Sequence, residues 1–400
     1  MRIAHTSDLH YAAETLTEVD RCFSYAVDHA IEENVEVAII SGDATDHQLD
    51  LHAKAVSSLA GQIKRLADHC PVLMLQGTFS HEPPGTLNVF RLLGGRFPVH
   101  VADRIEQVIL AHGRWYASES WCFDTIPKDA QLLVSCLPTI NKAAIAGVVG
   151  IADAAQAVGE QITALLKGFG VVNNLARKAG IPTIGVTHGT ISGCLTEHGV
   201  PMAGLDHEFT TGTLFAAQAS AFMAGHIHQH QEWEKDGRRI AYPGSVGRLH
   251  YGEVEPKGFL IWDVGADHAN TRFVETPARK MVHLDFAGMP DLDVIKQAAA
   301  SIEGAFVRVR WEMPEESRDA VDRQAMQSLL GAAAEVRLEG TIIRSVRSRA
   351  EGMLQAVTLA EKVAKWCAVT GTSQDGLAER LDALSNRDPE TVAAEILQQA

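Results

Sequence analysis

The first 80 residues alternate between short apolar runs and longer segments of helical periodicity. The runs 2–7 (RIAHTS), 35–41 (VEVAIIS) and 71–76 (PVLMLQ) predict buried strands, and helices are expected near 15–33 and 50–68. Short buried strands separated by amphipathic helices are typical of a βαβ arrangement. In such a sheet, polar residues that follow the strands meet at the carboxyl edge, where ligands bind. We therefore predict an α/β domain with its chemistry at this edge.

The hydrophobic pattern changes in the middle of the chain. Residues 143–180 carry apolar side chains at helical spacing, which predicts a helical insertion between strands. Short apolar runs resume at 181–189 and 221–228, each with Gly and His at its end, and again at 257–264. These runs predict further buried strands of the same domain.

A second, smaller pattern follows Pro277. An apolar run at 305–311, a helical segment near 318–334 and a run at 336–344 predict a small α+β domain. Helices are expected near 354–368 and 388–399. We therefore divide the chain into residues 1–275, 276–345 and 346–400.

Composition narrows the class of protein. A net charge of −15 gives no overall attraction to DNA or anionic lipid, so any nucleic-acid contact needs local basic groups or bound cations. The six Cys include no Cys-x-x-Cys pair, which fits a reducing compartment, and cytoplasm is expected. The N-terminus enters a strand directly, and charged residues interrupt the most apolar segments. We therefore expect neither a signal peptide nor a membrane span.

Clusters of His and Asp follow five of the predicted strands. Residues two apart in extended backbone face the same side, so Asp8 with His10, and His226 with His228, can each point two ligands into one pocket. Imidazole and carboxylate ligands suit Mn, Fe, Zn, Ni or Co. Two such ions about 4 Å apart would share a bridging carboxylate, for which Asp43 is the candidate, and would clamp a phosphate. The isolated residues His29, His69, His100, His112 and His283 are expected to be packed or solvated instead.

The order of these motifs resembles that of a known family. Asp-x-His, Gly-Asp, Ser-His-Glu, His-Gly and Gly-His-x-His follow one another as in the calcineurin-like metallophosphoesterases. The segments 242–253 (YPGSVGRLHYGE) and 257–264 (KGFLIWDV) resemble more narrowly the SbcD-type nuclease subunit of DNA double-strand-break repair complexes. The resemblance covers residues 1 to 264. It implies a four-layer α/β/β/α core, a small α+β cap domain at 276–345 and C-terminal helices.

The resemblance also implies an activity and roles for single residues. The chain would be a hydrolase of ester bonds, a two-metal DNA exonuclease or single-strand endonuclease, with manganese as the expected metal and Fe, Ni, Co or Zn left open. His81 would protonate the departing sugar oxygen, and Glu82 could orient its imidazole. Arg248 could bind substrate, or it could equally fix its loop through backbone hydrogen bonds. The implied metal ligands are Asp8, His10, Asp43 and His228 for one ion, and Asp43, His188, His226 and the residue in the Asn position for the other.

The Asn position itself is altered. The family's Gly-Asn-His is replaced by Gly-Thr-Phe-Ser-His, so the ligand is either Ser80, next to His81, or Thr78 followed by two additional residues. Ser80 is preferred because it keeps the spacing to His81. A hydroxyl is shorter than an amide arm, so weaker binding of the second metal is expected. Some relatives carry a His at the position of Asp46. The neighbouring His47 could serve as a substrate contact in its place, or be a simple loop residue, because loop geometry decides this.

Partners are expected from the resemblance as well. The implied partners are DNA and an SbcC-like ABC ATPase that binds the C-terminal helices; a homodimer stays open and no membrane contact is expected. Two other functions remain: a phosphodiesterase or phosphatase for a small or protein substrate, and a catalytically weak scaffold for the ATPase. The helical stripe that could face the ATPase, or be buried against the cap, consists of Leu354, Val357, Ala360, Val363, Ala364 and Cys367, with Trp366 alongside.

Overall fold

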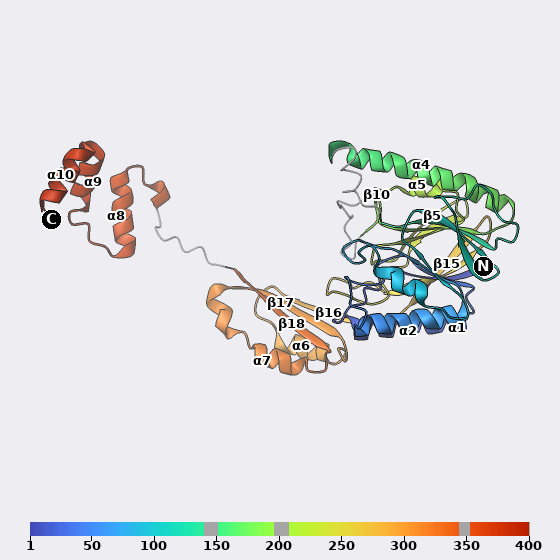
Figure 1. Ribbon diagram of the computed structural model, residues 1–400. Helices are drawn as coiled ribbons and strands as arrows, with labels where there is room; N and C mark the ends of the chain where they lie inside the picture. The colour runs from blue at the N-terminus through green and yellow to red at the C-terminus, as the bar shows by residue number, and fades with distance from the viewer. Residues whose placement is uncertain (140–150, 196–207, 344–352, 400) are drawn as a thin grey trace. The chain divides into compact units, whose positions relative to one another are not determined.

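The computed structural model describes residues 1–139, 151–195, 208–343 and 353–399 (Figure 1). The chain divides into two compact units. The first unit comprises Met1–Leu284, Leu292–Val309 and Met326–Leu338, and it contains two large sheets. The second comprises Asp285–Asp291, Arg310–Ala325 and Glu339–Ala400.

The first large sheet has six strands in the order β15-β14-β1-β2-β3-β4. Its centre is the parallel array predicted from the N-terminal apolar runs, and β14 lies antiparallel to β1. Polar loops therefore leave β1, β2 and β3 at one edge. The strands are β1 (Arg2–Thr6), β2 (Val37–Ile40), β3 (Val72–Leu75), β4 (Val99–Ala102), β14 (Gly258–Val264) and β15 (Ala269–Glu275).

The second large sheet has seven strands in the order β12-β13-β11-β8-β7-β5-β6. Strands β7, β8, β11 and β13 run parallel, and antiparallel strands complete both edges. The strands are β5 (Glu106–Ala111), β6 (Arg114–Ala117), β7 (Leu132–Leu137), β8 (Thr183–His188), β11 (Ala221–Gly225), β12 (Gln231–Lys235) and β13 (Arg238–Tyr242).

Alternating side chains join these sheets into layers. In β2, Val37 and Ile39 pack in the core shared with the second sheet, whereas Ala38 and Ile40 pack in the core shared with α1 (Leu16–Glu32) and α2 (Lys54–His69). The second sheet is covered on its outer side by α4 and α5 (Figure 1). The predicted four-layer α/β/β/α fold is thus confirmed. Helix α4 (Ile151–Lys178) forms most of the predicted insertion, with residues 143–150 outside the described part; α5 is Thr211–Ala216.

A three-stranded sheet follows in the order β16-β17-β18. The single helix predicted near 318–334 is wrong, because this stretch forms a short 3-10 helix and the short helix α7. Asp322 accepts a hydrogen bond from the amide of Ala325 at 2.8 Å and so caps the N-terminus of a separate helix, α7. The elements are β16 (Met281–Phe286), α6 (Leu292–Ala299), β17 (Phe306–Pro314), η2 (Glu315–Ala320), α7 (Arg323–Leu329) and β18 (Glu335–Ile343).

The C-terminal helices begin later than predicted. Thr358 and Glu361 form a capping box, so α8 spans Leu359–Thr370, and Val357 lies outside it with 90% of its surface exposed. The predicted stripe is therefore wrong at Val357, although Cys367 is buried. Within the described residues, helices long and apolar enough to cross a membrane are absent. The other elements of this part are η3 (Met353–Gln355), α9 (Leu377–Asn386), which was not predicted, and α10 (Pro389–Gln399).

Candidate metal centre

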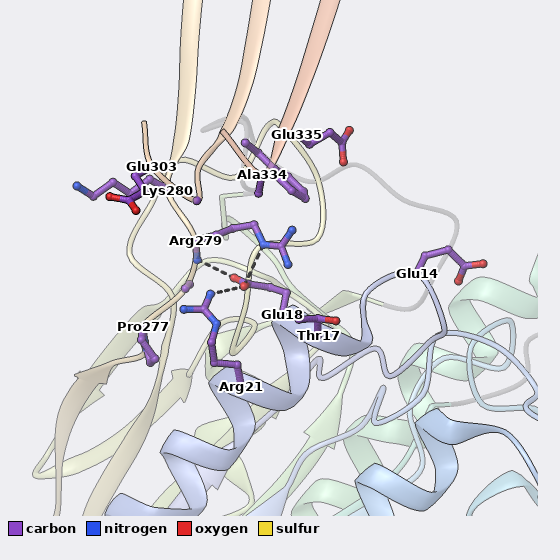
Figure 2. A pocket seen from close by; sticks show the side chains of 13 residues that line it. Glu14, Thr17, Glu18, Arg21, Pro277, Arg279, Lys280, Glu303, Ala334 and Glu335 are labelled. Carbon is purple, nitrogen blue, oxygen red and sulfur yellow. Dashed lines mark hydrogen bonds and ion pairs between the residues drawn. The ribbon is translucent and has the colours of Figure 1, made fainter. Parts of the chain in front are cut away.

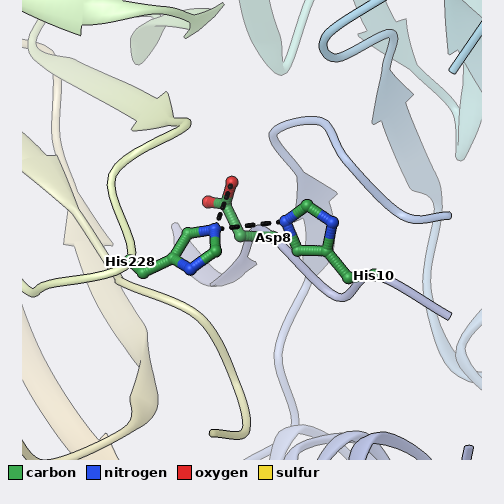
Figure 3. A group of neighbouring side chains, drawn as sticks. All are labelled: Asp8, His10 and His228. Carbon is green, nitrogen blue, oxygen red and sulfur yellow. Dashed lines mark hydrogen bonds and ion pairs between the residues drawn. The ribbon is translucent and has the colours of Figure 1, made fainter. Parts of the chain in front are cut away.

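Asp8, His10 and His228 converge where the loops after β1 and β11 meet (Figure 3). The Nε2 atoms of the two imidazoles lie 3.1 Å apart, and Asp8 Oδ1 lies 3.9 Å from His228 Nε2. Asp8 and His10 are buried. The three side chains thus present two nitrogens and a carboxylate to one point.

The Nδ1 atoms of these imidazoles have carboxylate neighbours. His228 Nδ1 lies 2.8 Å from Glu253 Oε1, and His10 Nδ1 lies 3.3 Å from Asp46 Oδ1. A proton on each Nδ1 leaves an unshared electron pair on each Nε2, and the two pairs then face one another beside the Asp8 carboxylate. The two electron pairs and the carboxylate repel one another unless a cation or a proton lies between them. This set of ligands therefore fits a divalent metal.

Asp43, His188 and His226 form a second group of ligands. His188 Nδ1 lies 2.8 Å from the Ser41 carbonyl oxygen, to which it donates, and its Nε2 lies 3.1 Å from Asp43 Oδ2. The backbone amide of His226 donates to both carboxylate oxygens of Asp8 at 3.1 Å. The second group therefore directly adjoins the first.

Asp43 and His188, both buried in the second group, shift the pKa of one another. Desolvation alone would lower the pKa of His188, but the carboxylate of Asp43 outweighs it and raises the pKa to about 10. Burial alone would raise the pKa of Asp43, whereas His188 and the other imidazoles lower it well below its usual range. A proton thus takes the place of a cation between these two side chains, and a metal must displace it to bind.

The backbone that carries these ligands adopts an uncommon conformation. Asp8, His10, Asp43 and His226 all have positive φ angles, of 52°, 49°, 49° and 107°. A Cβ atom on Gly77 would lie 2.2 Å from Asp43 Oδ1 and from the Asp43 amide nitrogen. The loops approach so closely that this position requires glycine.

Thr78, and not Ser80, lies at the second group of ligands. The amide and hydroxyl of Thr78 donate to Asp43 at 2.6 and 3.1 Å, and its hydroxyl oxygen lies 3.2 Å from His188 Nε2. Ser80 is exposed, and no hydrogen bond connects its side chain to this group among the described residues. The preference for Ser80 therefore gives way to Thr78, because the chain turns after Gly77.

His81 lies beside the first group, but Glu82 does not orient it. The imidazole of His81 meets that of His10 edge to face at 4.8 Å, and its Nδ1 lies 2.6 Å from the Asp46 carbonyl oxygen. Glu82 is fully buried and accepts hydrogen bonds from the amides of Ala44 and Gly77 at 2.6 and 2.5 Å. Burial and the charge of Asp43 raise the pKa of Glu82 to about 7. Glu82 thus connects the loops after β2 and β3 through hydrogen bonds to both.

Arg248 takes the second of its two expected roles, and His47 lies in a loop beside the site. All five N–H groups of Arg248 point to backbone carbonyl oxygens, at 2.8 to 3.4 Å. The guanidinium therefore holds the chain between β13 and β16 and has no donor left for a phosphate. His47 is half exposed and lies 3.4 Å from Asp46 Oδ2, so it neighbours the site through Asp46.

Three functional candidates were not predicted from sequence. Asp46 contacts His10 and His81, and Glu253 contacts His228. The ammonium of Lys257 lies 3.3 Å from Glu253 and donates to the His228 carbonyl at 2.9 Å. Glu253 and Lys257 are buried, and their opposite charges four residues apart, within and beside the segments that resemble the family, were the signal that could have revealed them.

Comparisons with known proteins give structural matches of low similarity. No family model matches the sequence, and no curated protein matches it. A dimetal phosphatase from Danio rerio has 11% sequence identity over 68% of this chain and 98% of that chain, with a TM-score of 0.41. GAP50, the anchor in the inner membrane complex of Plasmodium, has 12% identity over 69% and 84%, with a TM-score of 0.42. The phosphopantetheinyl hydrolase from Mycobacterium tuberculosis has 13% identity over 61% and 89%, with a TM-score of 0.31. Because these similarities are weak, we base the functional reasoning on the side chains of the site.

Proposed function

We propose that this chain is a phosphoesterase that depends on two divalent cations. The observation that carries the proposal is the junction of two ligand groups at one sheet edge, with His81 beside them. Asp8, His10 and His228 would hold one cation. Asp43, His188 and His226 would hold the other, with Thr78 in the position of the missing Asn and Asp43 shared between the two. When bound, such cations supply Lewis acidity toward a phosphate and a nucleophile from water near neutral pH.

His81 is the proposed general acid. Its Nδ1–H donates to the Asp46 carbonyl oxygen, which leaves the proton on Nε2 of the imidazolium for the departing oxygen. A leaving oxygen of high basicity, such as a sugar alkoxide, needs this proton, whereas a p-nitrophenolate does not. The reaction therefore discriminates between substrates by their leaving groups.

We propose DNA as the substrate, and an SbcC-like ATPase as the partner in DNA repair or processing. The segments that resemble the SbcD-type nucleases, 242–253 and 257–264, contain Glu253 and Lys257, which hold His228. The proposed ATPase site is on the C-terminal helices. Their exposed apolar side chains support it: Leu359, Trp366, Val369, Leu384, Ile396 and Leu397.

A second candidate is a catalytically weak scaffold. Thr78 offers a hydroxyl where the family has an amide carbonyl, and that hydroxyl donates to Asp43. This hydroxyl keeps lone pairs for a cation, but it is shorter than an amide arm, which favours weak occupancy of the second site.

One set of assays distinguishes these functions. Metal-free protein is mixed with manganese and then with linear duplex DNA, circular single strands, bis-p-nitrophenyl phosphate or p-nitrophenyl phosphate. Cleavage of DNA, lost in His81→Asn and retained in the exposed control His112→Asn, supports the nuclease. Hydrolysis of only the small esters contradicts DNA as the substrate and supports another phosphoesterase. Inactivity on all four substrates supports the scaffold.

A further inference from the structure

The turn that precedes His81 contains two additional residues. Where the motif of the resembled family reads Gly-Asn-His, residues 77–81 read GTFSH. Thr78 takes the Asn position, because its amide and hydroxyl donate to Asp43. The additional residues are therefore Phe79 and Ser80, and they lie between a candidate metal contact and the candidate acid.

This turn is held at both of its ends. The carbonyl of Thr78 accepts from the amides of the third and fourth residues after it, at 3.0 and 2.7 Å. Thr78 is bound to Asp43 at the start of the turn, and the hydroxyl of Thr45 donates to the His81 carbonyl at 3.2 Å at its end. The backbone at Phe79 is thus fixed beside the ligand groups by contacts that do not involve the Phe79 ring.

The surroundings of Phe79 do not account for an aromatic side chain. Its side chain is half-buried, and it is not among those that pack in or against the hydrophobic cores of the described residues. The ring contacts at the site join imidazoles to one another, as in His81 with His10 and His188 with His226. Within the described part of the chain, Phe79 has no stacked aromatic partner. A large apolar ring thus lies beside a polar site without serving the core.

We propose that Phe79 binds the substrate by stacking on an unpaired nucleobase next to the scissile phosphate. The inference rests on the proposed function, with DNA as the substrate. Consecutive Cα atoms are about 3.8 Å apart, so the ring is attached one residue from Thr78 and two from His81. A nucleotide whose phosphate lies between these two side chains brings its base to the same turn. Every base has a flat aromatic face, so this contact requires no particular sequence.

Stacking suits this chain for two reasons. The net charge of −15 opposes the phosphate backbone of DNA, whereas attraction between a base and a phenyl ring does not depend on charge. A base within a duplex already stacks on its neighbours and must leave them to reach Phe79. Phe79 should therefore favour single strands and frayed ends over closed duplex.

The first readout is binding of a single strand to the full chain in manganese, measured by fluorescence anisotropy. Each protein also carries His81→Asn, so that the strand is not cut. The ligands are oligothymidylate and the same sugar-phosphate chain with abasic positions. Phe79→Ala should weaken binding of oligothymidylate by roughly 5- to 100-fold and leave binding of the abasic strand unchanged. Phe79→Trp should bind both strands as the natural side chain does.

Phe97→Ala is the matched control. Phe97 is also half-buried, but it precedes β4 and so lies at the opposite edge of the parallel sheet from the ligand groups. This variant should bind both strands normally. An equal loss on the two strands, or unchanged binding of oligothymidylate by Phe79→Ala, would overturn the inference.

The second readout is manganese binding, measured by isothermal titration calorimetry. Phe79→Ala should bind manganese as the natural chain does, because Thr78 and His81 are held by other contacts. Loss of a manganese site would show that the ring supports the turn instead of the substrate, and would overturn the inference.

The third readout is the choice between strands. With His81 intact, the rates of cleavage of a single strand and of the matching duplex are compared. Phe79→Ala should lower the ratio of the first rate to the second, since the duplex does not use the ring. An unchanged ratio would overturn the inference.

Failure of this inference is distinguishable from failure of the proposed function. If the natural chain neither binds nor cleaves DNA, the proposed substrate is wrong, and this is shown without any Phe79 variant. If the natural chain cleaves DNA and Phe79→Ala matches it in binding and in the choice between strands, the inference fails and the proposed function stands.

Discussion

Glu253 accepts from Nδ1 of His228 at 2.8 Å while its other oxygen accepts from the amide of Leu249 at 2.8 Å. Its carboxylate is fully buried, and the ammonium of Lys257 lies 3.3 Å from it. Burial alone would raise the pKa of Glu253, but His228 and Lys257 lower it to about 2. The orientation of His228 is thus built into the protein before a metal binds.

Glu253→Gln should weaken manganese binding by roughly 10- to 100-fold, since His228 loses the carboxylate that holds its proton on Nδ1. The variant should also lose about 3 kcal/mol or more of unfolding free energy, because the buried ammonium of Lys257 loses the charge of the Glu253 carboxylate beside it. Calorimetric titration and urea unfolding measure the two effects.

A double variant separates metal binding from stability. Glu253→Gln with Lys257→Met also removes the buried ammonium, so part of the unfolding free energy should return while manganese binding stays weak. Wild-type manganese affinity in either variant would show that Glu253 has no role in orienting His228.

Gly77→Ala should disrupt the second group of ligands, because the added Cβ would lie 2.2 Å from Asp43 Oδ1. We expect a loss of roughly 2 kcal/mol or more of unfolding free energy together with loss of one manganese site. The matched control is Gly61→Ala, within α2 and with open space around the added Cβ, which should stabilise the chain by about 0.5 to 1 kcal/mol. Normal metal binding by Gly77→Ala would contradict the close approach of the two loops.

Binding of manganese near pH 7 should release on the order of one proton, because His188 holds a proton in the absence of metal and must give it up to act as a ligand. The raised pKa of His188, about 10, sets the sign: affinity should rise with pH up to that value. Titration in buffers of different ionisation enthalpy counts the protons. A binding enthalpy that does not depend on the buffer would contradict the protonated state of His188.

Glu18 should make stability depend on pH at the acidic end. Burial alone would raise its pKa, but the Arg279 amide at 2.7 Å and the guanidinium groups of Arg21 and Arg279 outweigh burial and lower it (Figure 2). A lowered folded-state pKa means that this stabilisation is complete above the ordinary value of 4.5 and is lost as pH falls through the folded value. Unfolding free energies of the natural chain and Glu18→Gln should therefore converge in acid. A constant difference between them at all pH values would exclude this contribution.

The sequence allowed prediction of the strands that alternate with clear helical segments near the N-terminus. β1, β2 and β3 fall within the predicted runs, and their polar exits meet as expected. β5 was not predicted because it contains Glu106 and Gln107, which are buried by contacts that the pattern does not reveal: Glu106 pairs with His100, and the side chain of Gln107 donates to Ser135.

At the site, the sequence indicated which types of residue act as ligands, but it did not indicate which side chains contact one another. Ser80 is adjacent to His81 in sequence, but the amides of His81 and Glu82 both donate to the Thr78 carbonyl, and this tight turn takes Ser80 away from Asp43. The role of Asp46 depends on where its loop places the carboxylate, which residue spacing does not determine.

The central claim is that two ligand groups bind two divalent cations side by side. Crystals of the full chain grown with manganese, measured for anomalous scattering at the manganese edge, test it most directly. The account predicts two anomalous peaks, one among Asp8, His10 and His228 and the other among Asp43, His188 and His226. Absence of manganese from these side chains, in crystals grown with the metal, would contradict it.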